Sequence, residues 1–203
     1  MRLIGMLDSP YVRRVAVSLK FMGLKFSHEP VSVFRHFDVF AGINPVVKAP
    51  TLVTDDGAVL MDSSLIIEHL ERLAPEQSLM PRDAGAHVRA LRITGLALAA
   101  CEKAVQIVYE HDLRPAEKQH QPWIDRVRGQ LLAACRLLEA EIGPRPGWLC
   151  SARPLQPDIS AAVAWRFTQN MLGNIVPRRD HPALDAFSDR MEALPELQST
   201  PAE

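Results

Sequence analysis

The sequence predicts a small α/β domain followed by an all-helical domain. Residues 1–75 contain short apolar runs and helical patterns in the order β-α-β, an irregular stretch, and then β-β-α. After a polar linker at residues 76–85, no convincing strand pattern follows, and apolar residues recur at the three- and four-residue spacings of helices. We therefore expect one domain at residues 1–75 and a second, all-helical domain at residues 86–203.

The first strand and helix are marked by their boundary residues. Residues 3–7 form a strand-like apolar run that ends at Asp8. Ser9 suits the N-cap of a helix and Pro10 suits its first position, while Gly23 suits a left-handed C-terminal cap. Between them, apolar residues mark one buried helix face: Val12, Val15, Ala16, Leu19 and Met22.

The rest of the first domain alternates strands with turns. A rigid turn containing Pro45 and Pro50 precedes one strand, and Asp55-Asp56-Gly57 joins that strand to the next as a β-hairpin. Asp62 and Ser63 can cap the helix that follows, and Pro75 stops it. The expected segments are a strand at 26–33, an irregular stretch at 34–43, the turn at 44–50, strands at 51–53 and 58–61, and a helix at 63–74.

The second domain is read as a series of helices separated by prolines and glycines. Pro182 suits the first turn of the last helix and Pro195 suits its end. The expected helices lie at 86–113, 124–142, 158–172 and 183–194, and the glycines and prolines at 143–147 interrupt the helical pattern.

The composition and charge exclude several classes of protein. The chain has 203 residues, of which 47% are hydrophobic and 23% charged, as in ordinary globular proteins. Its formal net charge of −1 creates no field that would attract nucleic acid or an anionic membrane. The basic pairs Arg13-Arg14 and Arg178-Arg179 lack interleaved aromatic residues, so we expect no nucleic-acid partner.

The cellular location follows from the cysteines and the chain start. Cys101, Cys135 and Cys150 are odd in number and far apart, which favours reduced thiols over disulfides or a zinc site. No secretory signal is visible at the N-terminus, and the most apolar run, at residues 93–101, is too short to span a bilayer. We expect a cytoplasmic protein that binds neither a membrane nor a metal.

Four motifs in the right order resemble those of cytosolic glutathione transferases, in particular bacterial members with a serine-type active site. The resemblance covers nearly the whole chain, and it implies a thioredoxin-like N-terminal domain before the helical one. The motifs are Ser9-Pro10-Tyr11-Val12-Arg13, the N-P-x-x-K-x-P-x-L turn from Asn44 to Leu52, the acidic-Ser pair Asp62-Ser63, and His181-Pro182-Ala183-Leu184 with Arg190 and Pro195.

Ser9 is the candidate catalytic residue. A thiol with the ordinary cysteine pKa of about 8.5 is mostly protonated at neutral pH, so a transferase must stabilise the glutathione thiolate. A hydroxyl at a helix N-terminus can donate to the sulfur, and the helix dipole favours its negative charge. A purely structural capping role explains Ser9 equally well from the local sequence.

The resemblance also implies the residues that bind glutathione. Pro50 is expected to follow a cis peptide bond, so that the backbone of Ala49 pairs with the cysteinyl part of glutathione as an added strand would. Lys48 suits the glycine carboxylate. Asp62 can accept from the γ-glutamyl ammonium group, and Ser63 with its helix N-terminus suits the γ-glutamyl carboxylate. Taken singly, these residues also fit a ligand-free turn, a solvated lysine and a capping pair.

Some positions depart from the family pattern. Val47 stands where many relatives have a small residue, and Asp62 is shorter than the more frequent Glu. Asp158 lacks the preceding Ser or Thr of the helix-start motif, so we expect it to be structural and to cap its own helix. No cysteine lies near the first helix. This weakens the interpretation as a thiol transferase or dehydroascorbate reductase, because these enzymes use a cysteine there as nucleophile.

The sequence therefore favours a glutathione transferase that acts on a small apolar electrophile, with glutathione as cosubstrate. Two alternatives stay open: a glutathione-dependent peroxide or disulfide reductase, and a non-catalytic interaction protein. The resemblance also implies a homodimer. The helix at 86–113 carries apolar residues on more than one face, as a helix covered by a neighbour and a partner would.

Overall fold

The computed structural model describes residues 1–144 and 146–202. Two residues lie outside the described residues: Arg145, in the expected interruption between helices, and Glu203, the last residue of the expected helical domain. The chain forms two compact units. Unit 1 comprises residues 1–79 together with 194–203, and unit 2 comprises residues 80–193. The C-terminal segment, which we had assigned to the helical domain, thus groups with unit 1.

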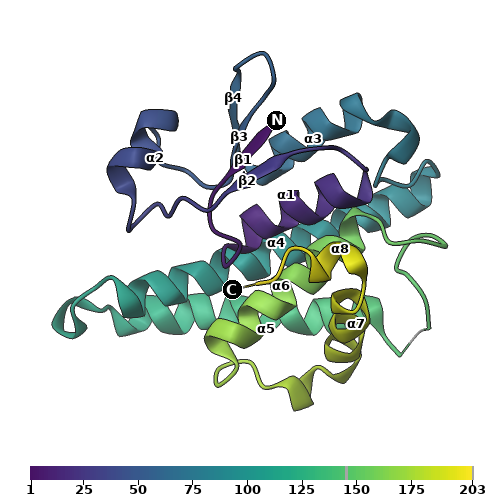
Figure 1. Cartoon of the computed structure of the whole chain (residues 1–203). Helices are drawn as coiled ribbons and strands as arrows, with labels where there is room; N and C mark the ends of the chain where they lie inside the picture. The colour runs from purple at the N-terminus through teal and green to yellow at the C-terminus, as the bar shows by residue number, and fades with distance from the viewer. Residues whose placement is uncertain (145, 203) are drawn as a thin grey trace. The chain divides into compact units, whose positions relative to one another are not determined.

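Unit 1 contains a four-stranded mixed sheet with the strand order β2-β1-β3-β4. β1 pairs parallel with β2 and antiparallel with β3, so Leu3 lies between His28 and Leu52. Helices α1 and α3 lie together on one side of the sheet and α2 on the other (Figure 1). The elements are β1 (Arg2–Ile4), α1 (Pro10–Phe21), β2 (Ser27–Glu29), α2 (Phe37–Ile43), β3 (Thr51–Val53), β4 (Val59–Met61), α3 (Ser63–Leu73), the 3₁₀ turn η1 (Pro75–Gln77) and α8 (Pro195–Gln198).

Helix α1 begins and ends where its boundary residues predict. Ser9 is the N-cap with Pro10 in the first turn, and Gly23 follows the C-terminus with a φ of 66°. Val12 and Leu19 are fully buried, and the residues between them are at most a few per cent exposed. The helix is therefore buried on all sides at residues 12–19, and its two arginines must find partners inside the protein.

Two short helices were not expected. Helix α2 falls in the stretch that we read as irregular, because Phe40 is its one buried residue and gives no helical period. Helix α8 begins at Pro195, which we read as a stop; proline ends one helix and suits the first turn of the next equally well. In unit 1, α8 packs against α1.

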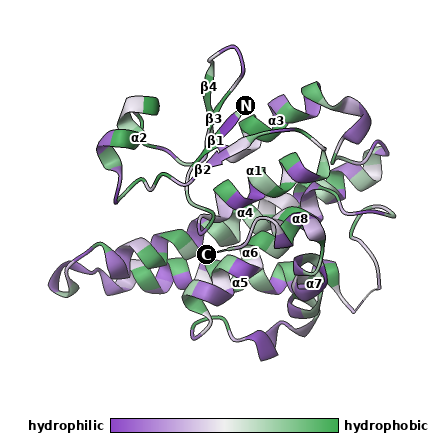
Figure 2. Ribbon diagram, in the orientation of Figure 1, coloured by the Kyte–Doolittle hydropathy of each residue, from purple (hydrophilic) through white to green (hydrophobic). Residues whose placement is uncertain are grey.

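Unit 2 is all helical in the part that the structure describes. Helix α4 packs against α5 and α6, and α6 packs against α7. Polar and apolar residues alternate around these helices (Figure 2), as expected for helices that bury one face. None of the described helices is long and apolar enough to cross a membrane. The elements are α4 (Ala84–Asp112), η2 (Ala116–Lys118), α5 (Gln121–Ile142), α6 (Gln156–Leu172), η3 (Arg178–Asp180) and α7 (Pro182–Glu192).

Asp158 holds the start of α6, as expected for a structural residue. Its side chain is fully buried, and its two carboxylate oxygens accept from the backbone N–H groups of Leu149 (2.9 Å) and Leu155 (3.0 Å). Burial raises the pKa of Asp158 to about 6, although both backbone N–H groups and Arg89 act in the opposite direction.

This raised pKa predicts how stability depends on pH. The carboxyl group titrates at about 6 in the native state and at about 3.9 in the unfolded chain. Between these values the native state binds more protons, so the contribution of Asp158 to the free energy of unfolding falls as pH rises, by at most about 1.4 kcal/mol per unit. Above the native pKa this contribution stays constant.

Urea denaturation of the wild type and of Asp158→Asn at several pH values between 4 and 8 tests this, because the asparagine does not titrate. We expect the difference in unfolding free energy, wild type minus variant, to decrease between about pH 4 and about pH 6. A difference that increases over the same range would show that the two N–H donors outweigh burial.

Candidate active site

Ser9 lies at the N-terminus of α1 with extended backbone angles. Its side chain is half-buried, and Oγ accepts from the backbone N–H of Val12 at 3.5 Å, a long hydrogen bond. Because this cap is weak, the hydroxyl can also serve a second partner. The structure therefore permits both roles that the sequence left open, capping and donation to a ligand.

The turn before β3 is held together by its own polar side chains. Asn44 is buried; its Nδ2 donates to Thr51 Oγ1 (2.9 Å) and its Oδ1 accepts from the Val46 backbone N–H (3.0 Å). Thr51 Oγ1 in turn donates to the carbonyl of Lys48 (2.7 Å). The Ala49–Pro50 peptide bond is cis, as the resemblance implied.

Two side chains of this turn differ in their surroundings. Lys48 is exposed, so its ammonium group can reach a ligand carboxylate but is not held by burial. Val47, one of the departures from the family pattern, has a φ of 51°. Few non-glycine residues adopt this left-handed conformation, and for a β-branched residue it is an outlier.

Gly5 brings the turn and the start of α1 together at the end of β1. A Cβ atom at Gly5 would lie 2.6 Å from Val12 Cγ2 and 3.2 Å from the Ala49 Cβ. The carbonyl of Gly5 also accepts a hydrogen bond from the ring Nε2 of His28 at 2.8 Å. Only a residue without a side chain permits this approach, so Ala49 and the first turn of α1 share one small region of unit 1.

Asp62 and Ser63 form the N-terminus of α3. Asp62 has a φ of 70°, and its Oδ1 accepts from the backbone N–H groups of Ser64 (2.9 Å) and Leu65 (3.4 Å). Ser63 is 3% exposed and is the first residue of the helix. One oxygen of Asp62 thus caps α3, as the alternative role of this pair as helix caps predicts.

Arg14 joins the two helices, and the sequence analysis missed it. Its guanidinium Nη1 donates to Ser63 Oγ (3.0 Å) and to Ser64 Oγ (3.1 Å), and the side chain is 4% exposed. We had read Arg13-Arg14 as an isolated basic pair. The available signal was the unbroken apolar run that follows, Val15-Ala16-Val17, which indicates a helix buried on more than one face.

Asp8 precedes Ser9 and adds a charge near the start of α1. Partial burial raises the pKa of Asp8, while a backbone hydrogen bond at Ser9 and the nearby charge of Arg35 oppose this rise. A carboxylate here disfavours a second anion at the same helix end.

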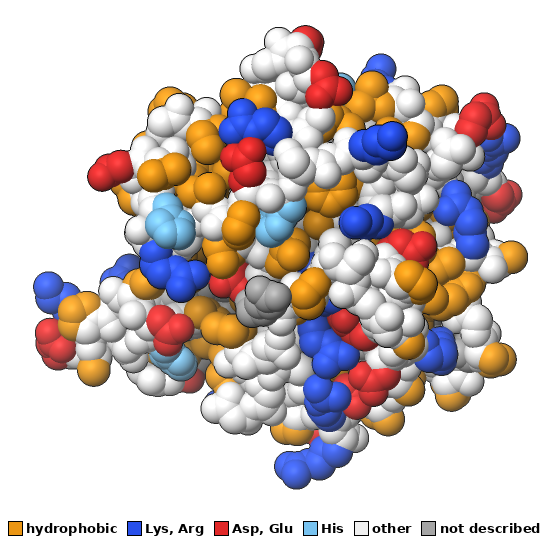
Figure 3. Space-filling view, in the orientation of Figure 1, with side chains coloured by type: hydrophobic (Ala, Val, Ile, Leu, Met, Phe, Trp, Pro, Cys, Tyr) orange, Lys and Arg blue, Asp and Glu red, His pale blue; other side chains and the backbone are white. Residues whose placement is uncertain are grey.

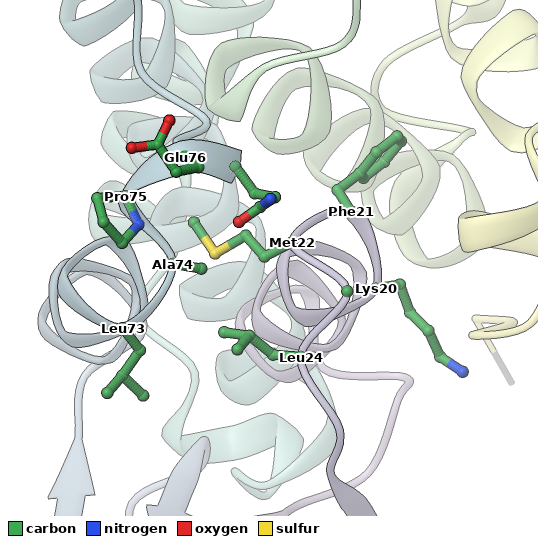
Figure 4. Close-up of a pocket in the computed structure, with 10 residues that line it drawn as sticks. Lys20, Phe21, Met22, Leu24, Leu73, Ala74, Pro75 and Glu76 are labelled. Atoms are coloured by element: carbon green, nitrogen blue, oxygen red, sulfur yellow. The ribbon is translucent and has the colours of Figure 1, made fainter.

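A cavity of unit 1 lies away from these residues. It has a volume of about 620 Å³ and lies between the C-terminal ends of α1 and α3. In Figure 4 the Met22 side chain extends from the end of α1 towards Ala74, while Lys20 points away. The N-terminal ends of the same two helices carry Ser9 and Ser63, so the cavity and the candidate site lie at opposite helix ends.

Three large side chains of unit 2 differ in their exposure. Tyr109 and Met171 are each 44% exposed. Trp165 is 2% exposed, and its Nε1 donates to Asp185 Oδ1 at 2.9 Å, so it belongs to the core of unit 2. On the face shown in Figure 3, basic and acidic side chains are interspersed, without a surface of one sign.

Two family models match the chain. The glutathione S-transferase N-terminal domain matches residues 3–78 and the glutathione S-transferase C-terminal domain matches residues 121–190. Among curated proteins, the uncharacterized GST-like protein YibF of Escherichia coli is 30% identical over 68% of this chain and 68% of its own length. Maleylacetoacetate isomerase of Pseudomonas aeruginosa is 31% identical over 74% of this chain and 72% of its own.

Solved structures give the same family. A glutathione S-transferase from Methylobacterium radiotolerans in complex with glutathione sulfonate has a TM-score of 0.91, with 28% identity over 98% of this chain and 93% of that one. A glutathione transferase family member from Pseudomonas fluorescens with bound glutathione has a TM-score of 0.84, with 29% identity over 100% of this chain and 98% of that one. With its thioredoxin-like first domain and all-helical second domain, the chain belongs to the glutathione S-transferase superfamily.

Proposed function

We propose that this protein is a glutathione transferase in which Ser9 stabilises the thiolate of glutathione for attack on a small apolar electrophile. One observation carries the proposal. Arg14, in the second turn of α1, donates to Ser63 at the N-terminus of α3. Gly5 lies close to both Val12 in the first turn of α1 and Ala49. Two helix N-termini and one turn thus surround a region suited to an anionic tripeptide.

In this proposal each part of glutathione has its own partner. The Ser9 hydroxyl donates to the sulfur, and the backbone of Ala49 pairs with the cysteinyl residue. Lys48 binds the glycine carboxylate. At the other end, Ser63 and the first N–H groups of α3 bind the γ-glutamyl carboxylate, and the second carboxylate oxygen of Asp62 accepts from the γ-glutamyl ammonium group.

The reaction then follows from the position of the charge. Each unit by which the thiol pKa falls below about 8.5 requires about 1.4 kcal/mol of preferential binding of the thiolate. With a halonitrobenzene as substrate, a sulfur lone pair forms the new carbon–sulfur bond, and the halide leaves with the electrons of the bond that breaks. The thiol proton passes to solvent when the thiolate forms.

A second candidate reaction is favoured by one relative. The similarity to a maleylacetoacetate isomerase suggests a cis–trans isomerisation on the same site. There the thiolate would add to a conjugated carbon–carbon double bond, the resulting single bond would rotate, and elimination would return the thiolate. Glutathione is regenerated in this reaction and consumed in the first.

Calorimetric titration with glutathione and assays with both substrate classes test the proposal. We expect saturable binding of one glutathione per chain and formation of a thioether from a halonitrobenzene. Turnover of maleylacetoacetate without loss of glutathione would select the isomerase. Reduction of a peroxide would select the reductase, and absence of glutathione binding would leave the interaction protein.

We further propose that two copies of the chain form a homodimer. Large apolar side chains are exposed in both units, and burying them against a second copy would remove them from water. Light scattering is expected to give about twice the 22.6 kDa of one chain at micromolar concentration. A mass of one chain across a dilution series would contradict this. The exposed apolar side chains that a second copy would bury include Val59, Met61, Leu65, Val88 and Leu91.

A further inference from the structure

Arg14 places a buried positive charge behind the first turn of α3. Its side chain is 4% exposed, and Nη1 donates to two hydroxyl groups at once, those of Ser63 at 3.0 Å and Ser64 at 3.1 Å. Burial of an arginine is costly unless its donors are used. A cation held at this helix N-terminus has the same sign as the positive end of the helix dipole, so the two together favour an anion there.

The chemistry of these contacts fixes the direction of a proton. A guanidinium group has donors and no acceptor, so the Ser63 Oγ must accept from Arg14. A serine hydroxyl that accepts still has its own O–H to donate. With one lone pair engaged by Arg14, the Ser63 hydroxyl keeps its O–H for a further partner, and an anion is the partner that a donor beside a guanidinium favours.

We propose that Arg14 is a positioning residue that selects ligands bearing a free γ-glutamyl carboxylate. It orients the Ser63 hydroxyl as a donor and contributes fixed positive charge without touching the ligand. This inference rests on the proposed function, in which Ser63 binds that carboxylate. Arg14 then determines specificity at one end of the tripeptide, far from the chemistry at the sulfur.

Arg13 provides a matched control on the same helix. It is 2% exposed, and its Nε donates to the carbonyl of Thr200 at 2.8 Å, with Nη2 near the carbonyl of Leu197 at 3.4 Å. These contacts hold the C-terminal segment on α1 and do not involve the α3 serines. Replacing Arg13 thus removes a buried arginine from α1 and leaves the Ser63 hydroxyl oriented.

The test compares two tripeptides on the full chain. Glutathione and γ-aminobutyryl-cysteinyl-glycine differ only in the carboxylate that Ser63 is proposed to bind. We expect Arg14→Met to weaken glutathione binding about tenfold and to change binding of the analogue less than about twofold. Arg13→Met is expected to leave the ratio of the two affinities as in the wild type.

A gentler variant keeps the test decisive if Arg14→Met does not fold. Arg14→Gln retains an N–H donor and loses the charge, so it is expected to shift the affinity ratio in the same direction by a smaller factor. In a Ser63→Ala background the same change is expected to have little further effect, because the Ser63 hydroxyl through which Arg14 acts has been removed.

The outcomes separate this inference from the proposed function. If the wild type binds no glutathione, the proposed function fails and the inference with it. If the wild type binds glutathione and the Arg14 variants keep the wild-type ratio of the two affinities, only the inference is overturned. A loss of affinity that is equal for both tripeptides overturns it as well, because it indicates a structural role.

Discussion

Ser9→Ala is expected to lower turnover with a halonitrobenzene about 100-fold, by analogy with the loss of one donor to a developing anion. Glutathione affinity should stay within a few-fold of the wild type, because the proposed contacts of Lys48, Ala49, Asp62 and Ser63 hold the rest of the tripeptide. The thiol pKa of bound glutathione should rise towards its ordinary value. Ultraviolet absorbance of the thiolate against pH measures this shift directly.

Two further substitutions separate the hydroxyl from the cap. Alanine at an N-cap costs about 1 kcal/mol, whereas glycine costs only a few tenths. If the hydroxyl acts on the sulfur, Ser9→Gly and Ser9→Ala should lose the same activity despite their different stabilities. Ser9→Asp keeps a good cap but places a carboxylate beside the sulfur, so it should raise the thiol pKa further.

The role of Ser9 fails on either of two results. Unchanged turnover in Ser9→Ala, with chemistry shown to be rate-limiting, would remove the catalytic role. A loss of glutathione affinity as large as the loss of turnover would mean that Ser9 makes a ground-state contact or supports the structure. Because the bond from the Val12 N–H to Ser9 Oγ is long, at 3.5 Å, Ser9→Ala is expected to cost no more stability than the ordinary loss of an N-cap, about 1 kcal/mol.

Features that depend on local chemistry could be predicted from the sequence. The start of α1 at Ser9-Pro10, its end before Gly23 and the start of α3 at Asp62 all follow from capping preferences of neighbouring residues. The cis bond before Pro50 followed from a motif. These elements needed no knowledge of what packs on them.

Features that depend on distant partners could not be predicted. Arg14 reads as a surface residue until Ser63, 49 positions away in the sequence, is placed beside it. Helix α2 buries only Phe40, so its sequence carries no periodic signal. The segment from Leu194 to Ala202 contacts the buried Arg13 through backbone carbonyl groups, which carry no sequence signature.

Gly5→Ala is expected to be the most destabilising small substitution in unit 1. The new Cβ would lie 2.6 Å from Val12 Cγ2, on a fully buried β-branched side chain, and the backbone φ of 136° is itself unfavourable for alanine. Strain of this backbone and overpacking each cost about 1–3 kcal/mol, so a loss of roughly 3 kcal/mol or more is expected. Urea denaturation measures it.

Gly57→Ala is the matched control for the backbone term. Gly57 also has a positive φ, 87°, but a Cβ there has nothing within 4 Å. Its substitution is expected to cost only about 1–2 kcal/mol. The difference between the two variants therefore measures the clash, and equal costs would show that the neighbours of Gly5 yield freely.

Removing the obstructing methyl group tests the cause of the clash. Val12→Ala alone leaves a small cavity and is destabilising, but combined with Gly5→Ala it removes the atom that lies 2.6 Å from the new Cβ. The two changes together should then cost at least about 1 kcal/mol less than the sum of the separate costs. Strict additivity would contradict the clash. The Ala49 Cβ, 3.2 Å away, would remain as the second neighbour, so Gly5→Ala should still weaken glutathione binding in the double variant if Ala49 forms the proposed contact.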